Sequence, residues 1–357
     1  MQRAYGVVNK NKIAEDLLSW YDINARKLPW RIPPLESKTG VLPNPYYIWM
    51  SEVMLQQTTV AAVKEYFLKF ITLWPTVFDM ANAKDEDVMA AWAGLGYYAR
   101  ARNLLKCARV IKNQYDGKFP SNEKDLLSLP GIGPYTAAAI MSIAFNKKAI
   151  VLDGNIERVM SRIYAVQEPL PASKKALWLL ASDLTPENRC GDYAQAVMDL
   201  GATICTPRSP KCTHCPWTSI CLGLSQGIAG ELPKKIPKLK KPVRVGTVYV
   251  AINDDHSMLL ERRPKKGLLG GMLGWPGSEW AIIPTDHLEP IEADWRSVNE
   301  PVRHTFTHFH LDLTIKIASN VKSVPRVGKF ISKDEFNPND LPTVMRKVWD
   351  KASEFLE

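Results

Sequence analysis

The chain has 357 residues, a formal net charge of +9, 46% hydrophobic residues, 26 prolines and six cysteines. This apolar fraction is typical of a globular protein and argues against a mainly disordered chain, and the length favours two domains. No apolar run reaches the roughly 18 residues that a membrane span requires, and residues 1–12 contain no apolar signal core. We therefore expect a cytoplasmic protein without a membrane partner.

Apolar residues recur at helical spacing through the first 200 residues, and prolines and glycines interrupt them repeatedly. This pattern predicts an all-α domain of many short helices over residues 1–230. Within it, residues 28–45 contain five prolines and little periodicity, which predicts a loop between the first two helices.

Residues 231–244 (ELPKKIPKLKKPVR) combine three prolines with six basic side chains, which predicts an exposed linker. Beyond it, residues alternate with a period of two over 243–251 and 306–314, as strands do. We expect a smaller α/β domain over residues 245–357 that closes with a helix near 341–356. The net charge is +6 before the linker, +5 within it and −2 after it, so a polyanion would meet the first two parts.

Four of the six cysteines are clustered, at Cys205, Cys212, Cys215 and Cys221. Cytosolic thiols usually stay reduced, so such a cluster indicates metal binding rather than disulfides. Four thiolates suit either a zinc ion or an iron–sulfur cluster. Zinc sites more often use two closely spaced pairs, and only Cys212 and Cys215 form such a pair here, which favours iron–sulfur.

Residues 129–135 (LPGIGPY) lie between two stretches of helical pattern. A turn with Gly131 and Gly133 between two helices exposes backbone amides at a helix N-terminus, where an anion can bind. Such a hairpin can hold a DNA phosphate without reading sequence. An ordinary helix connector is the alternative interpretation.

Two carboxylates are candidates for catalysis. Asp153, within VLDGNIER (151–158), follows an apolar run and starts a predicted helix, so it is an N-cap whose charge the helix dipole stabilises. Glu52 lies in an otherwise apolar helical stretch, and burial would raise its pKa and make it a general acid. A structural N-cap and an acid paired with lysine or arginine are the alternatives. One ionised and one protonatable carboxyl suit cleavage of a glycosidic C–N bond through an oxocarbenium-like state.

The hairpin, the Asp153 segment and the cysteine loop occur in the order found in helix-hairpin-helix DNA glycosylases, which the chain resembles. Three further segments, LPWR (28–31), EVMLQQT (52–58) and GLGYYAR (94–100), are similar to the MutY-type adenine DNA glycosylases. The resemblance covers essentially the whole chain. It implies a monomer, associated with the bacterial nucleoid, that uses a [4Fe–4S] cluster and acts on double-stranded DNA containing 8-oxoguanine:adenine or G:A mispairs. The enzyme would flip the adenine out of the duplex and hydrolyse its N-glycosidic bond.

The same resemblance assigns roles to residues. Glu52 would protonate adenine, Asp153 would stabilise the sugar cation and Asn155 would support Asp153. The residues implied to contact or shape the adenine pocket are Arg26, Trp30, Arg31 and Gln195. The residues implied to fill or wedge the duplex are Gln57, Thr58, Leu95, Gly96 and Tyr97. Tyr135 stands where endonuclease III-like enzymes carry a lysine that forms a Schiff base, so we expect a monofunctional glycosylase.

The C-terminal domain resembles the MutT-related domain of the same family. A Nudix pyrophosphatase needs a Glu-rich helix that holds magnesium, and residues 273–301 contain no such run. We therefore expect a domain that recognises 8-oxoguanine without hydrolysis, through residues 303–310 and especially Phe306, Thr307 and His308. The family usually has serine where this chain has Thr307, and a half-buried strand face is the alternative interpretation. Residues 32–44 look like an insertion to which we assign no function.

Two other functions compete with this interpretation. One is an endonuclease III-like glycosylase/lyase for oxidised pyrimidines, which Tyr135 and the additional C-terminal domain disfavour. The other is a noncatalytic DNA-damage binding protein that uses only the hairpin, the cluster and the basic linker. The presence of both Glu52 and Asp153 argues against it.

Overall fold

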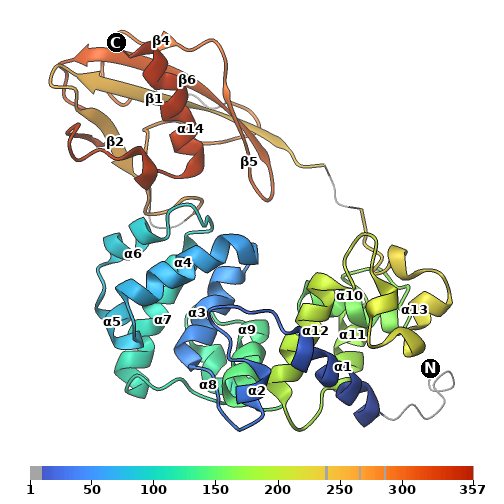
Figure 1. Cartoon of the computed structure of the whole chain (residues 1–357). Coiled ribbons are helices and arrows are strands. Elements are labelled where there is room, and N and C mark those ends of the chain that lie inside the picture. The colour runs from blue at the N-terminus through green and yellow to red at the C-terminus, as the bar shows by residue number, and fades with distance from the viewer. Residues whose placement is uncertain (1–9, 238–239, 265–266, 285–286, 357) are drawn as a thin grey trace. The chain divides into compact units, whose positions relative to one another are not determined.

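The computed structural model describes residues 10–237, 240–264, 267–284 and 287–356. The chain divides into two compact units, Met1–Asp85 with Arg102–Pro237, and Glu86–Ala101 with Lys238–Glu357 (Figure 1). Residues 238 and 239 of the predicted linker lie outside the described residues. None of the described helices is long and apolar enough to cross a membrane.

The N-terminal two thirds of the chain are helical, as predicted. The helices are α1 (Lys10–Asn24), α2 (Pro34–Ser37), α3 (Pro45–Leu55), α4 (Val60–Leu73), α5 (Val77–Asn82), α6 (Asp85–Ala91), α7 (Ala99–Tyr115), α8 (Glu123–Ser128), α9 (Pro134–Ala139), α10 (Gly154–Ile163), α11 (Lys174–Leu184), α12 (Cys190–Thr203) and α13 (Leu222–Ser225). The short helix α2 lies inside the segment that we expected to be a loop, because Pro34 occupies its first turn, where a missing N–H costs nothing.

Helix α3 positions the first candidate acid. Asn44 caps it by accepting a hydrogen bond from the Tyr46 amide, and Pro45 occupies its first turn. Its side chains are apolar nearly all round, so eight of its eleven residues are buried, Glu52 among them. A helix of this composition belongs in the interior of the unit, and its one carboxyl is buried with it.

The predicted hairpin is formed by α8 and α9, and a π-helical turn over Ile140–Ala144 follows α9. Gly131 adopts a left-handed φ of +79°, and a Cβ at this position would lie 2.8 Å from Cβ of Asn103. Both the backbone conformation and the close approach therefore require glycine here. The predicted N-cap is also confirmed, since Asp153 precedes α10 and accepts a hydrogen bond from the Ile156 amide.

The second unit contains a mixed sheet. Its strands are β1 (Val243–Asn253), β2 (Met258–Arg262), β3 (Leu273–Gly274), β4 (Arg296–Ser297), β5 (Val302–Thr305), β6 (His310–Val321) and β7 (Lys329–Ile331). The central path runs β3-β2-β1-β6-β4, with β5 paired to β6 and β7 paired to β2. Strands β1 and β6 are parallel, and Val243 pairs with His310.

Strand β1 begins at Val243, where the predicted alternation begins, so its first two residues overlap the predicted linker and pair with β6. The expectation for the second alternating stretch was wrong in part. Residues 306–309 do not continue the strand pattern and instead form the turn between β5 and β6, closed by a hydrogen bond of 2.9 Å from the Phe306 amide to the Phe309 carbonyl.

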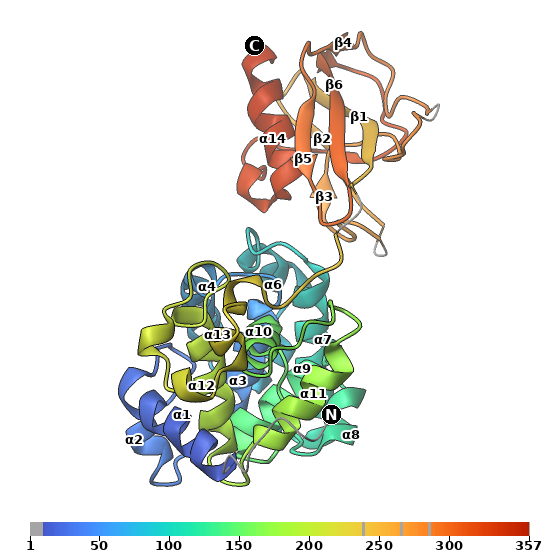
Figure 2. The ribbon, with the colours of Figure 1, turned by 90° about the vertical axis from the view of Figure 1, so that its right-hand side faces the viewer.

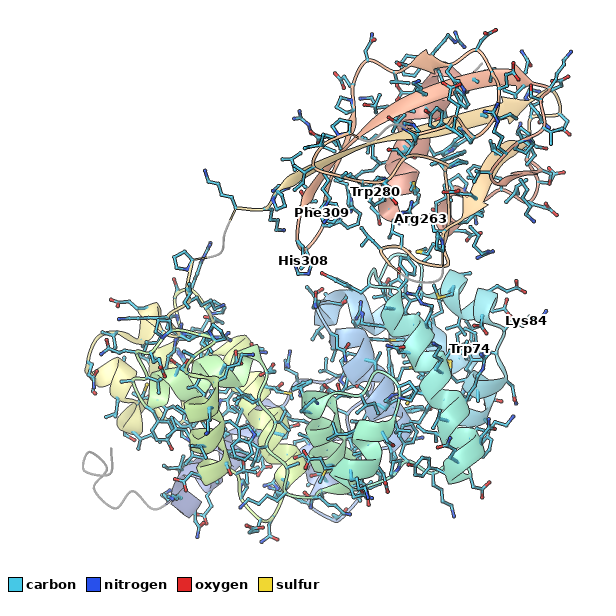
Figure 3. All side chains as sticks on the ribbon, turned by 180° about the vertical axis from the view of Figure 1, so that it is seen from behind. Trp74, Lys84, Arg263, Trp280, His308 and Phe309 are labelled. Carbon is cyan, nitrogen blue, oxygen red and sulfur yellow. The ribbon has the colours of Figure 1, made fainter. Side chains whose placement is uncertain are left out.

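Helix α14 (Thr343–Ala352) covers one face of this sheet, as Figure 2 shows, and confirms the predicted closing helix. Its buried residues Val344, Met345 and Val348 pack with Trp275 and with the β6 side chains in one apolar core. Trp280 and Phe306 pack against this core, and Figure 3 labels Trp280. The turn between β5 and β6 is therefore attached to the core by its first aromatic ring.

Candidate active site

Glu52 on α3 is 6% exposed and accepts a hydrogen bond of 2.9 Å, at Oε2, from the hydroxyl of Tyr135 in the first turn of α9. Burial raises the pKa of Glu52 to about 7, and the Tyr135 hydrogen bond and the Arg31 guanidinium oppose this shift. Burial also raises the pKa of Tyr135, so its hydroxyl stays a donor. The site therefore holds a carboxyl that can carry a proton at neutral pH.

Asp153 belongs to the same site. Its Oδ1 accepts from the Ile156 amide at 2.7 Å and its Oδ2 accepts from the Asn155 side-chain amide at 2.8 Å, at the positive end of the α10 dipole. The negative charge of Asp153 contributes to the raised pKa of both Glu52 and Tyr135. The structure thus joins the four predicted residues in one site: Tyr135 donates to Glu52, Asn155 donates to Asp153, and the charge of Asp153 raises the pKa of Glu52.

A chain of hydrogen bonds runs from Asp153 to the cysteine loop. The Oδ1 atom of Asn155 accepts from Arg158 at 2.9 Å, and Arg158 also donates to the carbonyls of Cys205 at 2.7 Å and Gly201 at 2.6 Å. A Cβ on Gly201 would lie 2.7 Å from Cβ of Asn155. The position of Asn155 beside Asp153 therefore depends on close packing against the end of α12.

A buried acid that sequence analysis missed, Asp199 on α12, holds two of the predicted pocket residues. Asp199 accepts from Arg26 Nε at 2.6 Å and from Arg31 Nη1 at 2.8 Å, and its side chain is fully buried. A detectable signal existed, because an acid in the middle of an apolar helix is costly to bury unless it is paired. Asp199 fixes the Arg31 guanidinium whose charge acts on Glu52.

The other two predicted pocket residues are packed into the interior. Trp30 is 5% exposed and contacts Phe67 edge-on, with ring centroids 5.2 Å apart. Gln195 is 6% exposed, lies one turn before Asp199 on α12 and donates to the Gly191 carbonyl at 3.2 Å. Their contact with adenine stays a prediction.

The segment after α3 has an unusual backbone. Gln57 is exposed and adopts a left-handed φ of +58°, which is uncommon for a residue with a side chain and is often found at functional sites. The Thr58 hydroxyl donates to the Gln56 carbonyl at 3.3 Å, and the Gln56 amide donates to the Thr136 hydroxyl at 3.3 Å. Gln56, which sequence analysis did not single out, therefore links this segment to the hairpin helix α9.

Leu95, Gly96 and Tyr97 form a tight turn that groups with the second unit. Gly96 and Tyr97 have φ values of +69° and +49°, and Arg100 donates to the carbonyls of Leu95 at 3.1 Å and Gly96 at 3.2 Å. The Tyr97 ring is 47% exposed, and its hydroxyl lies 2.7 Å from the hydroxyl of Thr307 in the same unit. Two residues predicted to meet DNA are thus in contact with each other.

The hairpin turn is open at Gly133, the N-cap of α9, because a Cβ there would find no atom within 4 Å. In the second unit, the turn between β5 and β6 exposes Thr307 and His308, whereas Phe309 is 6% exposed. Both predicted DNA-contacting turns therefore present an accessible surface.

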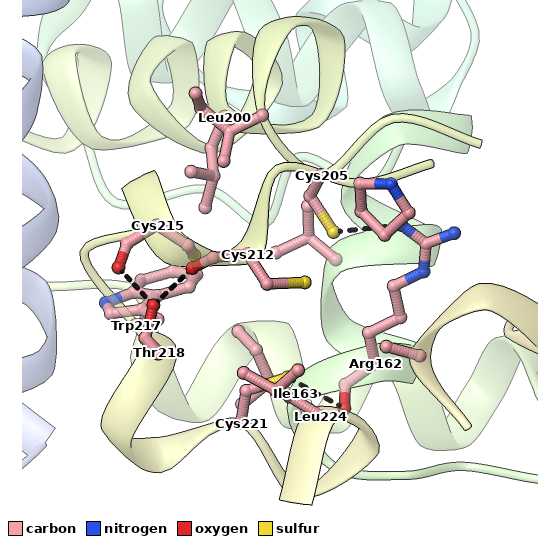
Figure 4. A pocket seen from close by; sticks show the side chains of 14 residues that line it. Arg162, Ile163, Leu200, Cys205, Cys212, Cys215, Trp217, Thr218, Cys221 and Leu224 are labelled. Atoms are coloured by element: carbon pink, nitrogen blue, oxygen red, sulfur yellow. Dashed lines mark hydrogen bonds between the residues drawn. The ribbon is translucent and has the colours of Figure 1, made fainter. Parts of the chain in front are cut away.

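The four clustered cysteines line one cavity, together with Leu200, Trp217 and Leu224 (Figure 4). None of the four cysteines forms a disulfide, and Arg162 donates to Cys205 Sγ at 3.3 Å and to the carbonyl of Thr206 at 2.7 Å. Burial raises the pKa of the Cys215 thiol to about 12, so its thiolate needs compensating positive charge. Four thiols around an apolar cavity fit an iron–sulfur cluster.

The sequence matches the HhH-GPD superfamily of base excision DNA repair proteins over residues 50–181, the iron-sulfur binding domain of endonuclease III over residues 205–221, and the NUDIX domain over residues 247–351. A solved structure of a thermostable thymine-DNA glycosylase is 33% identical and covers 61% of this chain and 97% of that one, with a TM-score of 0.53. These matches agree with the helical site and the cysteine loop.

Two curated relatives match over most of the chain. The adenine DNA glycosylase of Homo sapiens is 34% identical over 93% of this chain and 72% of its own length. The adenine DNA glycosylase of Buchnera aphidicola subsp. Schizaphis graminum is 31% identical over 93% of this chain and 96% of its own length. The chain belongs to the adenine DNA glycosylases. It is a DNA-binding enzyme of base excision repair that hydrolyses the N-glycosidic bond of adenine, and it carries a [4Fe–4S] cluster.

Proposed function

We propose that this enzyme removes adenine from duplex DNA where adenine is paired with 8-oxoguanine or guanine, and that it acts as a monomer on chromosomal DNA. The observation that carries the chemistry is the buried Glu52 carboxyl, whose pKa of about 7 makes it a proton donor. Burial raises this pKa, and the negative charge of Asp153 raises it further. Such a pair suits cleavage through a cationic sugar.

In this mechanism, Glu52 donates its proton to a ring nitrogen of the flipped adenine. The C1′–N bond then breaks, its electron pair leaves with the protonated base, and the sugar becomes an oxocarbenium ion. The Asp153 carboxylate, held by Asn155 and the Ile156 amide, stabilises this cation. Water adds to C1′ and gives a proton to the Glu52 carboxylate, which leaves an abasic site and restores the acid. Arg26 and Arg31, fixed on Asp199, would shape the base pocket together with Trp30 and Gln195.

The remaining residues would bind the duplex and the cluster. The hairpin amides at Gly131 and Gly133 would hold a phosphate, and Gln57, Thr58 and residues 95–97 would fill the space that the flipped base leaves. Cys205, Cys212, Cys215 and Cys221 would ligate the cluster, which when bound cross-links the loop and supplies positive charge to the thiolates.

We assign recognition of 8-oxoguanine to Thr307 and His308. Guanine presents an acceptor at N7, whereas 8-oxoguanine presents a donor at N7 and an additional carbonyl oxygen at C8. A hydroxyl group can accept from the N7–H of 8-oxoguanine and donate to its C8 carbonyl oxygen. The exposure of Thr307 and His308 at the end of their turn supports this assignment.

Base release from duplexes with a single defined pair tests the proposal. We expect fast adenine release from 8-oxoguanine:adenine, slower release from G:A, and no base release from thymine glycol:A or from G:T. The last two duplexes test the activities of an endonuclease III-like enzyme and of a thymine glycosylase. Absence of adenine release from the first duplex would overturn the proposal.

A second prediction concerns Tyr135. A phenol cannot form an imine with the sugar aldehyde, and this hydroxyl is bonded to Glu52. We therefore expect a monofunctional enzyme whose product strand stays intact until alkali is added, with no covalent complex after borohydride treatment. A variant with Tyr135→Lys gives the matched positive control for trapping. A borohydride-trapped complex of the unaltered enzyme at this position would contradict the prediction.

A further inference from the structure

A continuous series of cationic and aromatic side chains includes the two rings of the turn between β5 and β6. The guanidinium carbon of Arg263 lies 4.7 Å from the Trp280 ring centroid, and that ring lies 5.7 Å from Phe306 at an interplanar angle of 31°. Phe306 lies 4.9 Å from Phe309, also at 31°, and the Arg244 guanidinium carbon lies 4.3 Å from the Phe309 centroid. We call these five residues the cation–aromatic stack. Arginine closes it at both ends.

The stack joins segments that are distant in the sequence. Arg244 lies at the start of β1, Arg263 follows β2, and Trp280 lies beyond β3. The strand β1 is adapted to the indole, since a Cβ on Gly246 would lie 2.7 Å from Cδ1 of Trp280. Next to Trp280, Ala281 pairs with Val245 through backbone hydrogen bonds in both directions. The indole is therefore fixed against the first half of β1.

Two side chains of the turn belong to this stack, and the two between them face solvent. The Phe306 and Phe309 rings are in the stack, whereas Thr307 and His308 between them are exposed, and Figure 3 shows His308 at the end of the turn beyond Phe309. Lys241 donates to the Phe306 carbonyl at 2.8 Å. The two rings therefore anchor the turn on either side of the two polar side chains, and the Tyr97 hydroxyl, 2.7 Å from that of Thr307, adds a contact at the exposed side.

Two hydrogen-bond donors in the stack have no acceptor among the described residues. Nε of Arg263 and Nε1 of Trp280 are buried and have no hydrogen-bond partner there. A buried donor without a partner costs stability, whereas an apolar pair of similar size would avoid that cost. The arginine and the indole are therefore poor choices for packing alone, and their common feature is the cation–π contact between them.

We propose that Arg263 and Trp280 are positioning residues that set the preference for 8-oxoguanine over guanine without touching DNA. They hold Phe306, and through it they fix the place of Thr307 and His308 against the base opposite adenine. The inference rests on the proposed recognition of 8-oxoguanine by this turn. It assigns part of the specificity to residues outside the turn.

The test compares adenine release under single-turnover conditions from 8-oxoguanine:adenine and G:A duplexes, using the full-length protein with its cluster. Trp280→Leu removes the ring, and we expect it to reduce the ratio of the two rates about tenfold. The rate on the 8-oxoguanine:adenine duplex should fall, and the rate on the G:A duplex should stay unchanged. Trp280→Phe keeps a ring in the stack and is expected to retain most of the ratio. Trp295→Leu is the matched control, because Trp295 packs against a different core of the same unit and contacts the Tyr249 ring. Its ratio should equal that of the unaltered enzyme.

The outcomes separate the inference from the proposed function. If the unaltered enzyme shows no preference between the two duplexes, the recognition of 8-oxoguanine is wrong, and the stack has no specificity to set. If the unaltered enzyme discriminates and Trp280→Leu melts normally with an unchanged ratio, the inference is wrong. An equal loss on both duplexes also overturns it. Should Trp280→Leu fail to fold, Arg263→Gln against Arg263→Lys decides, because lysine keeps the cation and glutamine does not.

Discussion

Glu52→Gln is expected to abolish adenine release while binding to the mispaired duplex persists. Glutamine has the shape of glutamic acid and can accept the Tyr135 hydrogen bond, but it has no proton to donate. We expect a loss of about 10³-fold or more in the single-turnover rate, in the range of general acid catalysis. Gel-shift affinity for the duplex should stay within a few-fold of the unaltered enzyme. A variant that retains a tenth of the rate would contradict the role of Glu52.

The pKa of Glu52 gives this prediction an independent check. Since the folded enzyme holds the proton to about pH 7 and an exposed glutamate releases it near 4.5, the unaltered protein loses stability as pH rises between these values. Glutamine removes this loss, so Glu52→Gln should be more stable than the unaltered enzyme at pH 8, by up to about 3 kcal/mol.

The rate of the unaltered enzyme should fall as pH rises through about 7. Tyr135→Phe should move that fall to higher pH, because the Tyr135 hydrogen bond holds the pKa of Glu52 down and its removal lets this pKa rise.

Asp153→Asn is expected to reduce adenine release by about 10²- to 10³-fold, because it removes the negative charge that faces the sugar cation. Asparagine is also a good N-cap, so α10 should keep its start and the melting temperature should change little. Single-turnover rates and thermal melts of the same preparations measure both effects.

The matched control is Asp79→Asn. Asp79 belongs to the exposed capping box at the start of α5, where it accepts from the Thr76 amide at 3.0 Å. This change removes a carboxylate from the N-terminus of α5, which carries none of the groups that act on the pKa of Glu52, so its rate should equal that of the unaltered enzyme. If both variants slow the reaction equally, the effect of Asp153 would be structural rather than electrostatic.

Much of the fold could be predicted because local patterns dominate it. Helical spacing, the N-cap at Asp153 and the glycine at 131 are properties of neighbouring residues, and the structure confirms each of them. The expectation of alternation failed at residues 306–308, which form a turn closed by a hydrogen bond from the Phe306 amide to the Phe309 carbonyl. The Phe306 ring also packs against Trp280, which is distant in the sequence, so the alternation of neighbouring residues does not decide this segment.

The sequence by itself determined which groups are available: two carboxyls in helical contexts, four clustered thiols, and a tyrosine in place of a lysine. Only the tertiary structure decided how they act on one another. The pKa of Glu52 depends on burial within the unit, on Tyr135 from α9 and on the charge of Asp153 from α10. The pairing of Arg26 and Arg31 with Asp199 likewise joins residues far apart in the chain, as does the cation–aromatic stack at the turn between β5 and β6. Electrostatic and packing energies depend on distance in space, which spacing along the chain does not define.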